Sequence, residues 1–150
     1  MILAILQARM SSTRLPGKVL KPILGKPMLQ LQVERIKRSQ RIDHLVIATS
    51  ADATDDAIEI FCEQNKISCF RGSLDDVLDR FYQAAKKYSP DHIVRFTGDC
   101  PVVDPTLIDQ VIEHHLTSQA DYTSNTNPPT FPDGLDIEVC TFVALKKAWQ

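Results

Sequence analysis

The chain opens with the apolar run ILAIL at residues 2–6, which leads into the polar loop ARMSSTRLPGK at residues 8–18. The run predicts a buried first strand, because it is short, apolar and bounded by polar residues. The loop carries three cations, Arg9, Arg14 and Lys18. Fixed cations and backbone amides in a loop that follows a strand are typical of a polyphosphate site. On charge alone, a solvated basic loop remains the alternative.

The rest of the chain alternates short runs rich in β-branched residues with segments of helical period. This alternation predicts a three-layer α/β/α, Rossmann-like fold with a mixed, mainly parallel sheet. The predicted strands cover residues 2–6, 44–49, 68–70, 92–96, 121–124 and 136–140. The predicted helices begin at Pro27, near Ile58, at Ser73 with Asp76, at Pro105 and at Thr141. In such folds the ligand lies beyond the carboxyl ends of the strands, so we expect the site among loops 7–27, 50–55, 97–105 and 125–135.

Length and composition predict one domain over residues 1–150, since 43% hydrophobic residues suffice for a single core. The cationic loop predicts that this single domain is a nucleotide-binding one. The last helical pattern stops at Gln150 without a cap, which predicts a domain shortened at its C-terminal end. The net charge of −2 argues against nucleic-acid or membrane-surface partners. Because no signal-like or membrane-spanning apolar segment is seen, we expect a cytoplasmic protein. The four scattered cysteines are expected to be reduced thiols, and His114 and His115 to lie on a helix surface and edge.

Two familiar phosphate-binding motifs do not fit the first loop. A P-loop requires glycine at position 12 and a hydroxyl at position 19, where this chain has Ser12 and Val19. A dinucleotide fingerprint requires three glycines, and Gly17 stands alone. A glycosyltransferase is a further alternative, but the chain contains no D-x-D metal motif. The loop therefore predicts phosphate binding of another kind.

A triphosphate site with three cations still favours a metal ion, and a metal ion requires a carboxylate. The candidate is Asp99 in the segment RFTGDCP at residues 95–101, directly after the predicted strand 92–96. Gly98 permits a close backbone approach, and Pro101 stiffens the exit from the turn. The sequence therefore predicts that Asp99 holds Mg²⁺. A turn aspartate that caps its own backbone is the alternative.

These two segments resemble the opening and the metal turn of the cytidylyltransferases that activate acidic sugars. The nearest group is that of spore-coat polysaccharide biosynthesis, beside the sialic acid, pseudaminic acid and 3-deoxy-manno-octulosonate synthetases. The opening pattern of that superfamily is A-R-x-x-S-x-R-[LF]-x-G-K. It is matched in register by Ala8, Arg9, Ser12, Arg14, Leu15, Gly17 and Lys18. The resemblance continues through residues 46–50, 72–81, 98–101 and 132–139.

The resemblance implies a fold of the nucleotide-diphospho-sugar transferase type and a reaction in which CMP passes from CTP to a sugar. It implies that Arg9, Arg14 and Lys18 meet the phosphates, that Ser12 and Gly17 complete their loop, and that Asp99 binds Mg²⁺. The backbone at Leu6, Gln7 and Ala8 and the side chain of Arg80 would hold cytosine and ribose. The segment with Asp133, Asp136 and Glu138 would face the sugar. A homodimer is also implied, and relatives of this kind continue past the point that matches Gln150.

Several polar residues have a simpler explanation from the pattern alone. Arg80 lies two positions after Leu78, a residue of the apolar face of the predicted helix. Helical periodicity therefore places Arg80 off that face and predicts a solvated side chain. Asp136 and Glu138 alternate with apolar residues, so their face of a strand is either wet or part of a sugar site. The pairs 55–56 and 75–76 are explained by the first turns of helices, and Asp104 by an N-cap. Arg95 either pairs with an acid or reaches substrate.

Two alternative functions stay open on the sequence. An enzyme of the same fold would use UTP, GTP or dTTP with a sugar phosphate. A nucleotide-binding or assembly domain without catalysis belongs to a different class. Both would keep the phosphate loop and differ in what they do with the bound nucleotide.

Overall fold

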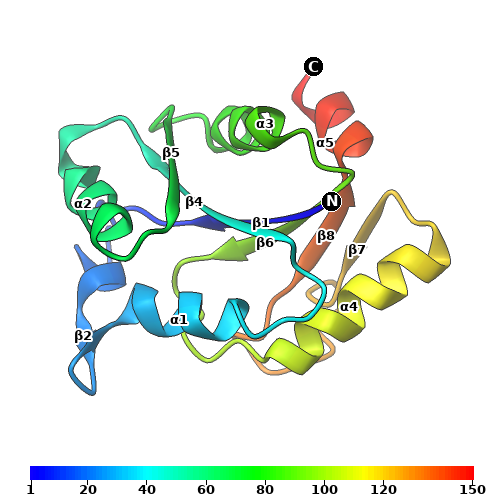
Figure 1. Cartoon of the computed structure of the whole chain (residues 1–150), viewed down its shortest axis with the longest axis horizontal. Coiled ribbons are helices and arrows are strands. Elements are labelled where there is room, and N and C mark those ends of the chain that lie inside the picture. The colour runs from blue at the N-terminus through cyan, green and yellow to red at the C-terminus, as the bar shows by residue number, and fades with distance from the viewer.

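Six strands form one mixed sheet in the order β5-β4-β1-β6-β8-β7 (Figure 1). The computed structural model describes all 150 residues. The first four strands in that order are parallel, whereas β8 runs antiparallel to both β6 and β7. The strands are β1 (Ile2–Gln7), β4 (His44–Ser50), β5 (Ser68–Gly72), β6 (His92–Thr97), β7 (Tyr122–Ser124) and β8 (Glu138–Thr141). The predicted fold class is confirmed.

Helices cover both faces of this sheet and complete the three layers (Figure 1). On one face lie α1 (Met28–Ile36), α2 (Asp56–Gln64) and α4 (Pro105–Ser118). On the other lie α3 (Val77–Tyr88) and α5 (Phe142–Trp149). Two single-turn helices, η1 (Lys18–Leu20) and η2 (Ala53–Asp55), follow β1 and β4. None of the helices combines the length and the apolar character needed to cross a bilayer.

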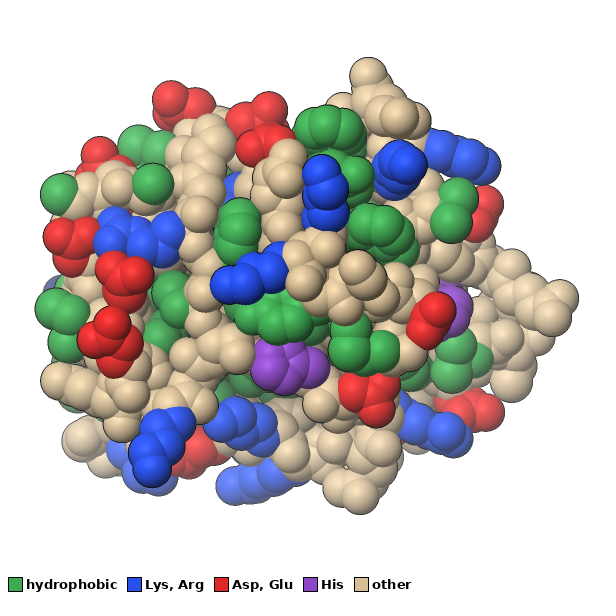
Figure 2. Space-filling model, turned by 45° about the horizontal axis from the view of Figure 1, so that its top comes forward, with side chains coloured by type: hydrophobic (Ala, Val, Ile, Leu, Met, Phe, Trp, Pro, Cys, Tyr) green, Lys and Arg blue, Asp and Glu red, His purple; other side chains and the backbone are tan.

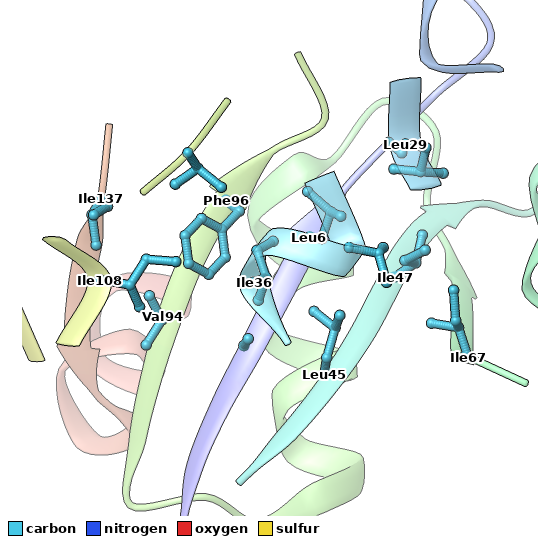
Figure 3. Packing of buried hydrophobic residues seen from close by; sticks show 14 of the residues in the cluster. Leu6, Leu29, Ile36, Leu45, Ile47, Ile67, Val94, Phe96, Ile108 and Ile137 are labelled. Carbon is cyan, nitrogen blue, oxygen red and sulfur yellow. The ribbon is translucent and has the colours of Figure 1, made fainter. Parts of the chain in front are cut away.

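The central strand β1 is buried on both faces. Ala4 and Leu6 contribute to the larger core cluster, and Leu3 and Ile5 to the smaller one on the opposite face. Successive side chains of a strand point to opposite faces, so a strand covered on both sides requires the continuous apolar run seen in the sequence. Figure 3 shows Leu6 near Ile36 of α1, with Ile47 of β4 on one side and Phe96 of β6 on the other. This packing fixes the ends of β1 and β6 beside each other.

Helix starts follow their capping aspartates. Asp104 accepts from the backbone N–H of Leu107 at 2.9 Å, and Pro105 begins α4, as predicted. For α3 the expected start at Ser73 is wrong, because Asp76 is the N-cap and accepts from the Asp79 N–H at 2.8 Å. The Ser73 hydroxyl instead accepts from the Asp76 N–H, which forms the turn before the helix.

Three further expectations need correction. His115, expected at the edge of its helix, is fully buried, and its ring hydrogen-bonds His92 of β6 and Thr123 of β7. Asp136 precedes β8, which begins only at Glu138. The predicted loop 7–27 contains a small hairpin of β2 (Pro22–Ile23) and β3 (Lys26–Pro27). Strands of two residues are too short to show a period, so the pattern of residues contains no sign of them.

The charged side chains do not gather into one basic face. Figure 2 shows Lys and Arg interspersed with Asp and Glu on the surface in view. The cations that matter for a ligand are therefore local ones, at the ends of the central strands.

Candidate functional site

The site begins where β1 and β6 end together. Gln7 and Thr97 are register partners at the ends of these two parallel strands. One residue later, the Gly98 N–H donates to the Gln7 carbonyl at 2.8 Å. A Cβ on Gly98 would lie 2.8 Å from the same oxygen, so no other residue fits without a shift of the backbone. This approach brings the loops after the two strands into contact.

The loop after β1 is closed by backbone hydrogen bonds to one residue. The Met10 carbonyl accepts from Ser12 N–H at 3.0 Å and from Gly17 N–H at 2.8 Å. Gly17 has φ +69°, the left-handed region that glycine occupies without strain. Because η1 starts at the next residue, the bend determines the direction in which Lys18 leaves the loop.

Lys18 and Asp99 meet across the two loops. The Lys18 ammonium donates to Asp99 Oδ2 at 2.9 Å, although 81 residues separate them in sequence. Lys18 holds the pKa of the Asp99 carboxyl below its usual value, since the ammonium stabilises the charged form. The Asp99 side chain is 44% exposed, so the carboxylate can still be reached from solvent. The cationic loop and Asp99 therefore lie in contact, as predicted.

A polar cleft of about 330 Å³ surrounds this contact. Seven of the predicted nucleotide-binding residues line it: Gln7, Arg9, Ser12, Arg14, Lys18, Arg80 and Asp99. An adjoining cleft shares Ser12, Arg14, Lys18 and Asp99 with it. Leu6 and Ala8 are buried beneath, with their side chains in the core. Gly17 closes the loop that carries these cations, through its hydrogen bond to Met10.

Arg80 is buried, contrary to the expectation from periodicity. Its side chain is 1% exposed, and Nη1 donates to the carbonyls of Ser73 and Leu74. The Arg80 side chain has room at the contact between α3 and β5 because residue 72 is a glycine. A Cβ at that position would lie 3.1 Å from Arg80 Cγ. Burial lowers the pKa of the guanidinium, and the nearby Arg9 lowers it further. The Nε atom is buried without a partner at the wall of the cleft.

The three acids predicted to face a sugar lie near one another. Burial raises the pKa of Asp136, with further contributions from Asp133, Glu138 and Asp99. Glu138 also pairs with Arg95 on β6 and accepts from the Tyr122 hydroxyl. This pairing answers the question that the sequence left open for Arg95.

The oxygen donors at Asp99 fit a hard cation such as Mg²⁺. No group of three or more His, Cys, Asp or Glu side chains is placed to hold a metal ion. Magnesium commonly binds through one or two carboxylates together with substrate phosphates and water, so a single exposed carboxylate beside phosphate-binding cations suits it.

Two buried side chains that hold the site's loops in place were not predicted from the sequence. Asp55 accepts from the Met10 N–H of the cationic loop at 2.7 Å, and it is fully buried. Gln32 on α1 is also buried and donates to the Thr97 carbonyl at 2.8 Å, which fixes the end of β6. Neither contact has a local signal, because each partner lies at least 45 residues away.

The mixed sheet with helices on both faces matches solved nucleotidyltransferase structures of the α/β type. The chain belongs to the cytidylyltransferase family, whose sequence model, described as Cytidylyltransferase, matches residues 3–150. The family resemblance predicted from the sequence motifs is thereby confirmed.

Two curated relatives are longer than this chain. The spore coat polysaccharide biosynthesis protein SpsF of Bacillus subtilis is 46% identical over 132 residues, which cover 85% of this chain and 55% of SpsF. The uncharacterized protein MJ1063 of Methanocaldococcus jannaschii is 44% identical over 149 residues, which cover 99% and 60%. The chain therefore spans less than two thirds of the length of either relative.

Solved structures agree with the fold. A cytidylyltransferase from Leptospira borgpetersenii superposes with a TM-score of 0.92 at 38% identity, covering 97% of this chain and 62% of that one. The synthetase of CMP:2-keto-3-deoxy-manno-octonic acid, complexed with CTP, gives a TM-score of 0.78 at 19% identity, covering 99% and 77%. At that identity the second likeness concerns the fold alone.

Proposed function

We propose that this chain is the nucleotide-binding part of an enzyme that transfers CMP from CTP to a sugar hydroxyl and releases pyrophosphate. Membership of the cytidylyltransferase family supports CTP as the nucleotide. The name of the Bacillus subtilis relative supports a role in surface polysaccharide biosynthesis. For the sugar we propose an acidic keto-deoxy sugar, from the motif resemblance. The observation that carries the proposal is the contact between Lys18 and Asp99 inside a cationic cleft.

In this proposal the loop binds the triphosphate by charge and by fixed geometry. Arg9 and Arg14 are exposed at the cleft, where their guanidinium groups can donate two hydrogen bonds to one phosphate. Lys18 would leave Asp99 for the phosphates and neutralise the departing pyrophosphate. Ser12 lies between these cations and offers a hydroxyl donor. Positioning and neutralisation of this kind supply most of the rate in phosphoryl-type transfers.

Asp99 would hold the Mg²⁺ ion, which when bound neutralises phosphate charge and orients the α-phosphate for in-line attack. The carboxylate is suited to this role because it stays ionised and is reachable from the cleft. Release of Lys18 from Asp99 would free the carboxylate and the ammonium in the same step. The protein groups thus exchange one ion pair for two contacts with the ligand.

The remaining predicted residues would contact the cytosine and ribose of the nucleotide and the sugar substrate. The backbone at 6–8 and the Arg80 guanidinium, whose Nε is unpartnered, would contact cytosine and ribose. Asp133 and Asp136 would face the sugar on the side of Asp99. Glu138 would take part through the pair that it forms with Arg95 at the edge of the same region.

A pyrophosphate-release assay tests the proposal. We expect release from CTP with Mg²⁺ and an acidic keto-deoxy sugar, and slower release with UTP, GTP or dTTP. Preference for another nucleotide together with a sugar phosphate would favour the related sugar-phosphate enzyme. Binding of CTP without release, also in the full-length relative from Bacillus subtilis, would favour a non-catalytic domain. Light scattering in solution tests the homodimer that the resemblance implies.

A further inference from the structure

We infer that Asp55 is a positioning residue for the cationic loop, in which its buried carboxylate fixes the Arg9–Met10 peptide and thereby the directions of Arg9 and Lys18. The inference rests on the proposed function, because it states how the phosphate-binding groups are held before the nucleotide arrives. It assigns Asp55 a role other than the helix-end explanation that its sequence position favours.

Asp55 is the last residue of η2, which runs directly into α2, and its carboxylate makes no capping hydrogen bond to either helix. The start of this helical segment is capped by Asp52, which accepts from the Thr54 N–H at 2.9 Å. The carboxylate of Asp55 is therefore free of a capping role and is directed to partners outside its own helix.

The partners of Asp55 come from two other segments. Oδ1 accepts from the Met10 N–H at 2.7 Å, and Oδ2 accepts from the Ser50 N–H at 3.1 Å and the Ser50 hydroxyl at 2.5 Å. The residue is 0% exposed. Burial alone raises the pKa of this carboxyl, but the donors from Met10 and Ser50 outweigh it and bring the pKa below its usual value. The group is thus a buried anion held by donors of the loop after β1 and the end of β4.

Met10 connects Asp55 to the rest of the loop. Its N–H belongs to the peptide that follows Arg9, so the bond to Asp55 fixes the backbone from which Arg9 projects. Its carbonyl accepts from Gly17 N–H, and Gly17 directly precedes Lys18. Lys18 in turn reaches Asp99 at 2.9 Å. The contacts therefore run without a break from Asp55 to the cation and carboxylate proposed to meet the triphosphate.

Asp55 also offsets the cations around it. Arg9 and the buried Arg80 lie close enough for Arg9 to lower the pKa of Arg80, whereas Asp55 acts in the opposite direction on Arg80. Like charges in a partly desolvated site repel each other more strongly than in water. A fixed anion behind the loop lets both guanidinium groups stay near the phosphate position. Positioning and charge compensation both depend on the same carboxylate.

The test compares Asp55→Asn with Asp52→Ala. Asp52 lies in the same turn, is exposed, and caps η2 through the Thr54 N–H at 2.9 Å without touching the loop. In the nucleotide-free chain we expect Asp55→Asn to speed tryptic cleavage after Arg14 and Lys18 by about tenfold, since the charge-assisted hydrogen bond that holds the loop is weakened. Asp52→Ala is expected to leave cleavage at these positions unchanged.

Calorimetric titration provides a second measurement on the same variants. We expect Asp55→Asn to weaken CTP binding by about tenfold and CMP binding much less, because the loop meets the outer phosphates. A purely structural role would leave the ratio of the two affinities as in the wild type. Unchanged cleavage and an unchanged ratio in a folded Asp55→Asn chain would overturn the inference. If the wild type bound no CTP, the proposed function would fail, while the cleavage comparison would still decide the role of Asp55.

Hydrogen exchange of the wild-type Met10 amide covers the case in which Asp55→Asn does not fold. A slow exchange, relative to the exposed amides of Ser11 and Thr13, supports the anchoring contact. An exchange as fast as theirs contradicts it.

Discussion

At the level of single residues, the site rests on an ion pair between groups that the sequence keeps 81 positions apart. Lys18 and Asp99 are charged groups of opposite sign on two loops brought together by the close approach of Gly98 to Gln7. Exposed pairs of this kind contribute little stability, since water and salt screen them. Their value lies in placing a carboxylate and an ammonium side by side where a metal–phosphate complex would need one of each.

Asp99→Asn is predicted to abolish Mg²⁺-dependent nucleotide turnover and to leave the fold intact. The amide keeps the size of the side chain but loses the charge that a hard cation requires. Turnover is measured by pyrophosphate release and the fold by circular dichroism. Asp75→Asn, at an exposed position outside the cleft, serves as the matched control. Full activity of Asp99→Asn would remove Asp99 from the mechanism.

Lys18→Ala is predicted to weaken CTP binding by about 1.5–3 kcal/mol, the range of a lost charge-assisted contact, and CMP binding by less. The reason is that the ammonium is expected to meet the outer phosphates, which CMP lacks. Titration calorimetry with both nucleotides makes the comparison. Equal losses for CTP and CMP would indicate that Lys18 only supports the loop.

Gly98→Ala is predicted to lower the free energy of unfolding by about 1–3 kcal/mol, the usual effect of forcing an extra carbon into a packed site. Its Cβ would meet the Gln7 carbonyl, a backbone atom that cannot move away as a flexible side chain would. Urea denaturation measures the change. A stability equal to that of the wild type would show that β1 and β6 can separate at this point.

The structure brings several of the predicted site residues together. Arg9, Arg14, Lys18 and Asp99 occur within motifs at fixed spacing, and the structure brings all four to one cleft. Asp55 was assigned to the first turn of a helix, and Arg80 to a solvated helix face, because such patterns describe only the helix itself. Their burial results from contacts with the first loop and with the turn at residues 73 and 74, which no period within one helix contains.

At the level of elements, the strands were predictable because the sheet is covered on both faces. Each of β1, β4 and β6 required an apolar run, and each was found with its end extended by one residue. The start of α3 was misplaced because Ser73 and Asp76 both resemble caps, and only the Asp79 N–H distinguishes them. The short strands β2 and β3 depend on their mutual pairing, which composition does not show.

His115 makes stability depend on pH at the junction of β6, α4 and β7. Burial, with a contribution from His92, lowers the pKa of His115 below its ordinary value of 6.5. The unfolded chain therefore binds more protons below pH 6.5, and stability is lost as the pH falls through that value. We predict a slope of up to about 1.4 kcal/mol per pH unit from this group.

Denaturation at about pH 7.0 and about pH 5.5, on either side of the ordinary histidine pKa, checks this prediction with His115→Gln and His114→Gln. His114 is exposed on the same helix and should leave the pH dependence as it is in the wild type. His115→Gln should reduce the difference in stability between the two pH values. An equal pH dependence in all three chains would assign the titration to other groups.

At the level of the whole molecule, the chain forms a three-layer sheet domain with its cationic loop at the ends of the central strands (Figure 1). It does so within less than two thirds of the length of its curated relatives. In the proposed function, nucleotide binding depends on the loops after β1 and β6, and both are present. Turnover and sugar selection remain part of the proposed function, because the chain spans only part of the length of these relatives.

Ligand stabilisation tests which nucleotide the whole domain prefers. CTP with Mg²⁺ at about 100 times its Kd should add about 2.7 kcal/mol to the free energy of unfolding. UTP, GTP and dTTP at the same concentration are expected to add less. Thermal denaturation with each nucleotide gives the order directly. A larger stabilisation by one of the other three would move the proposal to that nucleotide.

The central claim is that the cationic loop and Asp99 converge on one magnesium–triphosphate complex. A crystal structure of the chain with CTP and Mg²⁺ tests it most directly. In that structure we predict that the Lys18 ammonium has left Asp99 for the β- and γ-phosphates. We also predict that a metal ion lies between Asp99 and the triphosphate. A triphosphate bound away from both loops, or a Lys18–Asp99 pair unchanged beside bound nucleotide, would contradict it.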